Sequence, residues 1–137
     1  MQHDQFIGQV QARARLSSRG EAERATRSVL ETLGERIPEG LAENLAAQLP
    51  IEVGEHLRRT EVFSGYGTGE RFDLDEFVAR VSSRSGFDEP RAAFAARVVC
   101  EVVDEATQGG VMDKVQQSLP EDVQSLVTAG STGQMHD

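Results

Sequence analysis

The chain has 137 residues and a net charge of −9, from 23 acidic and 14 basic residues. This length suits one domain, or two very small ones that share apolar surface, and a negative field disfavours nucleic-acid binding unless basic residues cluster on one face. No apolar run approaches the ~20 residues that span a bilayer, and the first ten residues lack the basic and then apolar pattern of a signal peptide, so we expect a cytoplasmic protein without membrane contact.

Helical spacing of apolar residues runs through the first half of the chain. It predicts four helices, around residues 4–10, over 19–36, over 41–48 and from Pro50 onwards. Ser18 and Glu21 have the spacing of a capping box, in which each side chain satisfies a free backbone N–H at the start of a helix. Ile51, Val53 and Leu57 would form the inner face of the last helix.

The same pattern runs a second time. Residues 75–81 repeat residues 4–10 at an offset of 71, and from Ser18 on the offset becomes 70. Ten of the forty positions from Ser18 to Leu57 are identical in the second copy. We therefore predict an all-α fold of two tandem four-helix repeats, packed into one compact helical bundle and related by a pseudo-twofold axis.

The predicted organisation has a first helical repeat, a Gly-rich linker, a second helical repeat and a flexible tail. They cover residues 1–57, 58–72, 73–127 and 128–137. Asp73 and Asp88 are expected to cap helices of the second repeat, and Gly86 to end one in a left-handed conformation. The helix after Asp88 is apolar on most sides, so we expect it at the centre of the molecule.

Two short motifs occur once in each copy: Phe followed by Ile or Val with a further Val, and Leu-Pro after the short helix. They read Phe6-Ile7…Val10, Leu49-Pro50, Phe77-Val78…Val81 and Leu119-Pro120. In this order the chain resembles the prokaryotic family called domain of unknown function 2267, over nearly all of residues 5–127. The resemblance implies an all-helical tandem fold in a prokaryotic cytoplasmic protein, and it supplies no activity, substrate or catalytic residue.

No catalytic, cofactor-binding or metal-binding group is predicted, so we do not expect an enzyme. His3, His56 and His136 lack the spacing of a metal site. Cys100 is the only cysteine, has acidic neighbours and corresponds to Leu30 in the repeat. A reactive thiol needs positive surroundings, so we expect Cys100 to be a core residue.

Five arginines between Arg13 and Arg27 form a local basic patch on an acidic chain. The candidate partner-binding residues are four of these arginines and two aromatic residues near the glycine run: Arg13, Arg15, Arg19, Arg24, Phe63 and Tyr66. The leading hypothesis is a non-enzymatic interaction or regulatory module with a protein partner. The alternatives are a small-ligand or enzymatic site between the repeats, and nucleic-acid binding through the Arg13–Arg27 patch.

Two questions stay open at this point. The sequence does not indicate the oligomeric state. Of the 14 basic residues only Lys114 is lysine, which either a high-salt cytoplasm or codon bias would explain.

Overall fold

The computed structural model describes residues 1–64 and 71–131, and this part of the chain consists of eight helices without a strand. The first four are α1 (His3–Arg13), α2 (Arg19–Arg36), α3 (Glu39–Gln48) and α4 (Ile51–Ser64). The next four are α5 (Leu74–Ser85), α6 (Glu89–Ala106), α7 (Val111–Gln117) and α8 (Glu121–Thr128). The all-α prediction is confirmed. In the described ranges no helix has the length and apolar character to cross a membrane.

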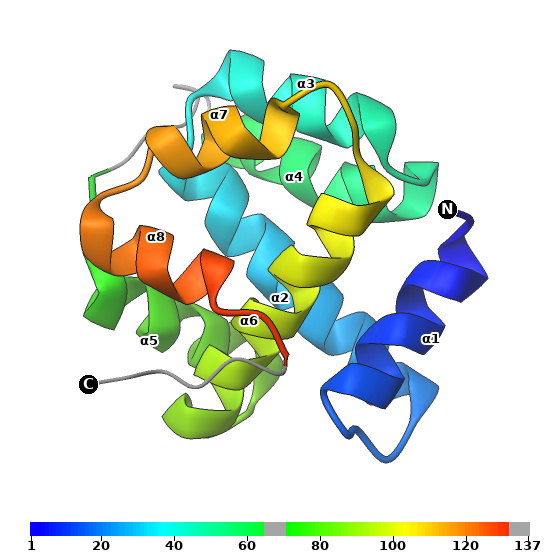
Figure 1. The fold of residues 1–137 in the computed structure, drawn as a ribbon. Coiled ribbons are helices and arrows are strands. Elements are labelled where there is room, and N and C mark those ends of the chain that lie inside the picture. Colours follow the sequence, from blue (N-terminus) through cyan, green and yellow to red (C-terminus); the bar gives the residue numbers. More distant parts are fainter. Residues whose placement is uncertain (65–70, 132–137) are drawn as a thin grey trace.

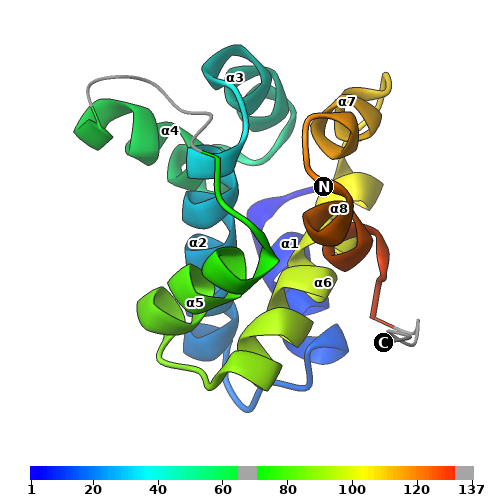
Figure 2. The ribbon, with the colours of Figure 1, turned by 90° about the vertical axis from the view of Figure 1, so that its left-hand side faces the viewer.

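The two longest helices, α2 and α6, lie side by side through the middle of the molecule (Figures 1 and 2). α2 packs against α1, α4, α5 and α6, and α6 packs against α1, α2, α5 and α8. α3 and α7 meet at one end, while the connections α1–α2 and α5–α6 lie at the opposite end (Figure 2). The expectation that α6 is central is therefore correct, and α2 shares that position.

The core is built from the apolar faces that the helical spacing predicts. Phe6 of α1 and Phe77 of α5 are its two largest fully buried side chains, and they occupy corresponding positions in the two copies. Leu30 and Leu33 line the buried side of α2, and Val98 is among the buried residues of α6. Each such side chain contributes roughly 1.5–3 kcal/mol when it is fully buried.

The helix starts follow the predicted caps with one difference. The Ser18 side chain accepts a hydrogen bond from the backbone N–H of Glu21, and Asp88 caps α6 in the same way. The Glu21 carboxylate does not return to Ser18: it accepts bonds from the backbone N–H and the hydroxyl of Ser17. Gly86 ends α5 at φ 79°, the left-handed conformation that glycine adopts without a steric penalty.

Two helix boundaries and the placement of one residue differ from the sequence prediction. α3 begins at Glu39, directly after Pro38, because a proline needs no N–H at a helix start. α4 continues to Ser64, so residues 58–64 of the predicted linker are helical. Ile51 is exposed and not on the inner face, since it stands in the first turn of α4, ahead of the buried residue Val53.

The chain beyond α8 is held against α6 as far as the structure describes it. Arg97 donates from Nε to the carbonyl oxygen of Gly130 at 3.0 Å. The Ser131 hydroxyl donates to Glu101 Oε1 at 3.1 Å, and its backbone N–H donates to the other oxygen of that carboxylate. The predicted flexible tail is thus anchored at residues 130–131.

The division into two repeats related by a pseudo-twofold axis stays a prediction. A pseudo-twofold axis would exchange α1 with α5 and α2 with α6, and the contacts among these helices agree with such an exchange. α1 packs on α2 and on α6, and α5 packs on α6 and on α2.

Gly54 is required by the close approach of α3 and α4. A Cβ atom at this position would stand 2.6 Å from the carbonyl oxygen of Ala46, well inside van der Waals contact. Gly54→Ala should therefore lower the free energy of unfolding by about 1–2 kcal/mol, because overpacking outweighs the gain in helix propensity.

Gly8 in the middle of α1 is the matched control, because a Cβ there meets nothing within 4 Å. Gly8→Ala should raise the free energy of unfolding by about 0.5–1 kcal/mol. Urea unfolding followed by circular dichroism measures both changes. Equal stabilisation by the two substitutions would contradict the predicted clash.

Candidate functional site

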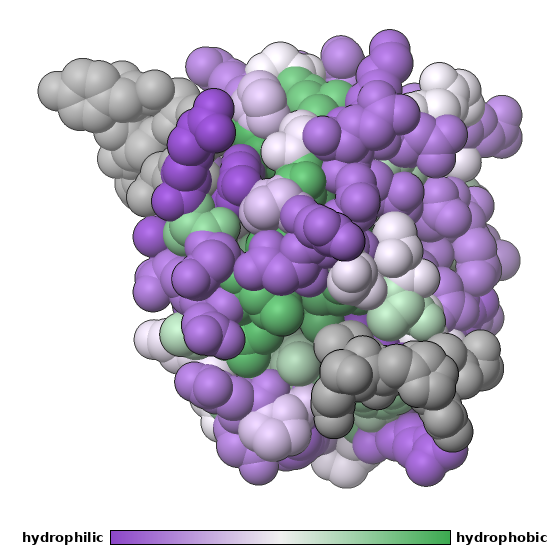
Figure 3. Space-filling model, turned by 60° about the vertical axis from the view of Figure 1, so that its left-hand side comes forward, coloured by the Kyte–Doolittle hydropathy of each residue, from purple (hydrophilic) through white to green (hydrophobic). Residues whose placement is uncertain are grey.

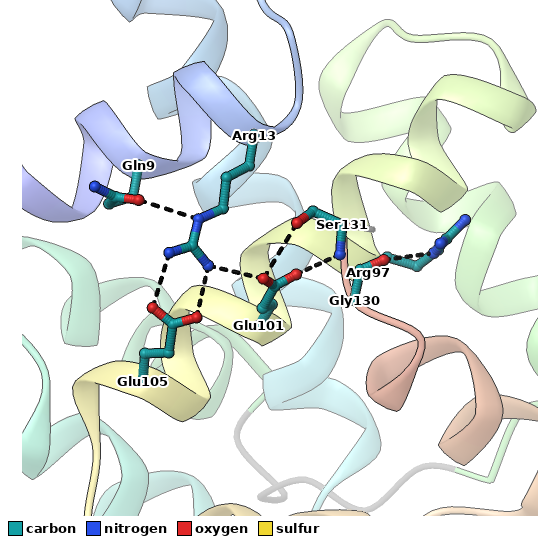
Figure 4. Close-up of polar contacts among 7 residues, drawn as sticks. All are labelled: Gln9, Arg13, Arg97, Glu101, Glu105, Gly130 and Ser131. Carbon is teal, nitrogen blue, oxygen red and sulfur yellow. Dashed lines mark hydrogen bonds and ion pairs between the residues drawn. The ribbon is translucent and has the colours of Figure 1, made fainter. Parts of the chain in front are cut away.

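Arg13, a predicted partner-binding residue, is bound within the molecule. Its guanidinium donates to Glu101 at 2.9 Å and to both carboxylate oxygens of Glu105 at 2.7 and 2.8 Å, and Gln9 accepts from Nε at 3.0 Å (Figure 4). Arg13 lies at the end of α1 and both glutamates lie on α6, one turn apart. The hydrogen bond and positive charge of Arg13 lower the pKa of Glu105 against a small opposing effect of burial.

A matching contact joins an arginine of the second half of the chain to two glutamates of the first half. Arg84 of α5 donates to Glu35 at 2.7 Å and lies 3.8 Å from Glu31, both on α2. Arg84 is the residue 71 positions after Arg13, and Glu31 and Glu35 stand 70 positions before Glu101 and Glu105. We call these two contact sets the reciprocal clasp: Arg13 with Glu101 and Glu105, and Arg84 with Glu31 and Glu35.

Glu35 is the more deeply placed carboxylate of the clasp. Burial raises its pKa, but the hydrogen bonds and charges of Arg84 and Arg80 lower the pKa by more, so the net shift is downward. Arg80 donates to Glu35 at 3.2 Å. The carboxylate is therefore charged at neutral pH and neutralised by two arginines of α5.

The other predicted arginines do not form one patch with Arg13. Arg19 donates to Asp4 at 2.7 Å and to Glu23 at 3.1 Å. Arg24 lies with its guanidinium 5.8 Å from the centroid of the Phe87 ring. Arg15 and Arg24 are the two of these arginines that are exposed and have no bonded acid among the described residues. The side chain of Phe63 and the whole of Tyr66 lie outside the described part of the chain.

A small apolar hollow, which we call the junction notch, lies where the α1–α2 connection meets α6. Its volume is about 190 Å³. It is lined by Ala14, Leu16, Pro90, Arg91, Phe94 and Ala95. Two of these residues come from the first half of the chain and four from the second, and Arg91 is the only ionisable one.

A second hollow, which we call the histidine pocket, lies between α1, α2 and α4 and has a volume of about 430 Å³. It is lined by His3, Ile7, Gly20, Glu23, Arg24, Arg27, Glu52, Val53 and His56. Sequence reasoning assigned no role to either histidine, since they are far apart in the chain and lack metal-site spacing. The packing of α1 against α4 brings them to one hollow.

A protein-family model described as an uncharacterized conserved protein, DUF2267, matches residues 3–126 of the chain. The chain belongs to the DUF2267 family. The resemblance seen in the sequence is thereby confirmed. A comparison with curated proteins finds no match.

In this DUF2267 chain, Cys100 is a core residue as predicted. It is buried in α6, and burial raises the pKa of its thiol to about 12. In the described part of the chain no group of three or more His, Cys, Asp or Glu residues is placed to hold a metal ion.

Replacing one arginine of the reciprocal clasp should destabilise this DUF2267 protein. Arg84→Gln should cost about 1–2 kcal/mol, because it removes charge-assisted bonds to carboxylates that are only 16–18% exposed. Arg13→Gln should cost less, since Glu101 and Glu105 are 26% and 47% exposed. Arg15→Gln is the control and should change stability by less than ~0.5 kcal/mol.

The loss caused by Arg84→Gln should depend on pH. The folded-state pKa of Glu35 is below its ordinary value of 4.5, so its stabilising effect is present above that value and lost as the pH falls through the folded-state pKa. Denaturant midpoints measured from pH 7 to pH 3 should therefore show wild type and Arg84→Gln converging in acid. A constant difference would show that the ion pairs do not cause the loss.

Cys100 should resist modification in the folded protein. A bulky disulfide reagent at pH 8 should label it only at the rate of unfolding, because the thiol is both buried and protonated. Labelling in denaturant should be fast and reach one equivalent per chain. Fast labelling without denaturant would contradict the core placement.

Proposed function

We propose that this protein is a cytoplasmic, non-enzymatic interaction module that binds an acidic, apolar segment of a protein partner at the junction notch. The observation that carries the proposal is an apolar hollow with Arg91 in its lining and Arg15 beside it, on a protein of net charge −9. An apolar side chain of the partner would fill the hollow, and the two arginines would donate hydrogen bonds to neighbouring carboxylates.

The backbone beside the notch supports a binding role. Arg15 stands between the lining residues Ala14 and Leu16 and has φ 56°, the one positive φ outside glycine among the described residues. This left-handed conformation is unfavourable for a long side chain, and it leaves Arg15 exposed. Strained residues of this kind concentrate at binding sites.

Two more arginines lie near the apolar lining. Arg91 lies over Phe87, 4.5 Å from the ring centroid, with its side chain 52% exposed and its nearest acid, Glu21, 3.9 Å away. Arg97 lies 5.4 Å from the ring centroid of Phe94, but its guanidinium is already bonded to the carbonyl oxygen of Gly130. A guanidinium held on an aromatic ring, as that of Arg91 is, is well ordered, so less entropy is lost when it binds a carboxylate.

The described residues expose few large hydrophobic side chains on which a partner could dock. The face in Figure 3 is mostly polar, with hydrophobic residues in a limited band. Met1 and Ile51 are the large hydrophobic residues that the described part of the chain exposes. Recognition through one small apolar hollow with charges around it fits this surface better than docking on a broad apolar face.

The same observations weigh against an enzymatic site between the repeats and against nucleic-acid binding. Arg91 is the only ionisable residue in the lining of the notch between the two halves, so no acid–base pair is available there for catalysis. Arg13 and Arg19 are each bound by two carboxylates, which reduces the positive charge that a nucleic acid would need.

Capture of partners by tagged protein from its native lysate tests the proposal. Wild type is compared with Arg15→Glu/Arg91→Glu, which reverses two charges at the notch, and with Arg27→Gln as a matched arginine control outside the notch. We expect a protein that wild type and the control retain at low salt, that high salt releases, and that the double variant fails to retain. Mass spectrometry identifies the retained protein.

Retention of the same proteins by all three baits would contradict the notch as the binding site. Retention of a small molecule without any protein would contradict the interaction module itself. Circular dichroism of each bait shows that the variants are folded.

A further inference from the structure

The histidine pocket contains polar groups that the protein itself does not satisfy. Arg27 makes no ion pair or hydrogen bond with any described residue, although it stands among charged neighbours. The Nδ1 atom of His56 is buried and has no hydrogen-bond partner in the described part of the chain. A buried polar atom without a partner is costly and is rare in proteins, so a ligand is a natural partner for it.

The charges of the pocket are arranged in two levels. Arg59 of α4 donates to Glu31 of α2 at 3.1 Å, which fixes the register of the two helices. One turn earlier His56 and Arg27 line the pocket, and one further turn earlier Glu52 and Glu23 do so. Arg27 and His56 thus stand at one level of the pocket, and Glu23 and Glu52 stand together with Arg24 about one helical turn or roughly 5–6 Å away.

The charged side chains of the pocket differ in how far neighbouring residues already neutralise their charges. Glu23 accepts a bond from Arg19 at 3.1 Å, whereas Glu52 has only His3, with Nδ1 of the imidazole 4.0 Å from its carboxylate. Burial, followed by the charges of Arg59, Arg27 and His3, lowers the pKa of His56 to about 4 against the opposing charge of Glu23. His56 is thus neutral at pH 7. Of the pocket arginines without a bonded acid among the described residues, Arg27 stands one turn away from Glu52 and Arg24 stands beside it.

The second half of the chain lacks this pocket chemistry at the same positions. The residues that correspond to His3, Glu23, Arg24 and His56 by the repeat offsets are Leu74, Ala93, Phe94 and Leu126. The residue that corresponds to Arg27 is Arg97, and it donates to the backbone carbonyl of Gly130. The first half therefore has ionisable side chains at four positions where the second has apolar ones, whereas Glu52 corresponds to another acid, Asp122. Unlike Arg97, Arg27 has no bonded partner among the described residues.

We propose that the histidine pocket binds a small zwitterion of the amino-acid type, with its carboxylate on Arg27 and its ammonium group on Glu52. His56 would complete the carboxylate end through its Nδ1 atom. The lining has no Phe, Tyr or Trp side chain, so it favours an ammonium group that donates hydrogen bonds over a quaternary one that needs an aromatic cage. This function is separate from the protein-binding role proposed above.

Titration of the full chain with single compounds, followed by NMR and calorimetry, tests the assignment. The probes are the common α-amino acids and β-alanine, with acetate, methylammonium and glycine betaine as analogues that lack one part of the charge pattern. We expect saturable binding of at least one amino acid, with each analogue about tenfold weaker or more, as the loss of one charge-assisted bond implies.

Substitutions in the histidine pocket test the carboxylate-binding and the ammonium-binding residue one at a time. Arg27→Gln and Glu52→Gln should each weaken binding of the amino acid about tenfold or more, while Lys114→Gln, at an exposed residue outside both hollows, should leave the affinity unchanged. Both pocket positions lie at the rim of a hollow, and thermal melting checks that each variant is folded.

Three outcomes would overturn the proposal. Acetate binding as tightly as the best amino acid would show a simple anion site. Unchanged affinity in the folded Arg27→Gln and Glu52→Gln proteins would place the ligand elsewhere. Absence of a saturable response to every amino acid would exclude this ligand class, without bearing on the junction notch.

Discussion

The contact on which the rest of the fold depends is the reciprocal clasp between the two halves of the chain. α2 and α6 lie together at the centre, and each carries a pair of glutamates that faces an arginine from the other half. Partly buried carboxylates need compensating charges, and here each half supplies some of them to the other, while Glu31 is also bound by Arg59 of its own half. Neither α2 nor α6 satisfies these carboxylates alone, so the two halves are required to pack in one register.

Those features of the fold that depend on neighbours in sequence could be predicted from the sequence. Apolar spacing gave eight helices and the central place of α6, and the caps at Ser18 and Asp88 are local hydrogen bonds. Cys100 could be placed in the core because its position in the repeat corresponds to Leu30. Helix ends were less accurate, since α4 continues to Ser64 and the spacing of apolar residues does not define where a polar helix stops.

The candidate sites depend on contacts between distant residues, and this part was not predictable. Arg13 and Arg19 were grouped because they are close in sequence, yet their acidic partners lie on other helices and separate them in space. His3 and His56 lack metal-site spacing in the sequence, and only the packing of three helices brings them to one pocket. A comparison of the two copies could have indicated this pocket, because the apolar pattern of the second copy is interrupted in the first.

The reciprocity of the clasp also bears on the history of the chain. A contact set that is the same in both directions is that of an isologous dimer, in which two identical surfaces pair about a twofold axis. One half alone already contains both the arginine and the glutamates that such a pairing uses. Duplication and fusion of its gene would keep the contacts and make them intramolecular. Assembly would then no longer depend on protein concentration, and the two copies could diverge from one another.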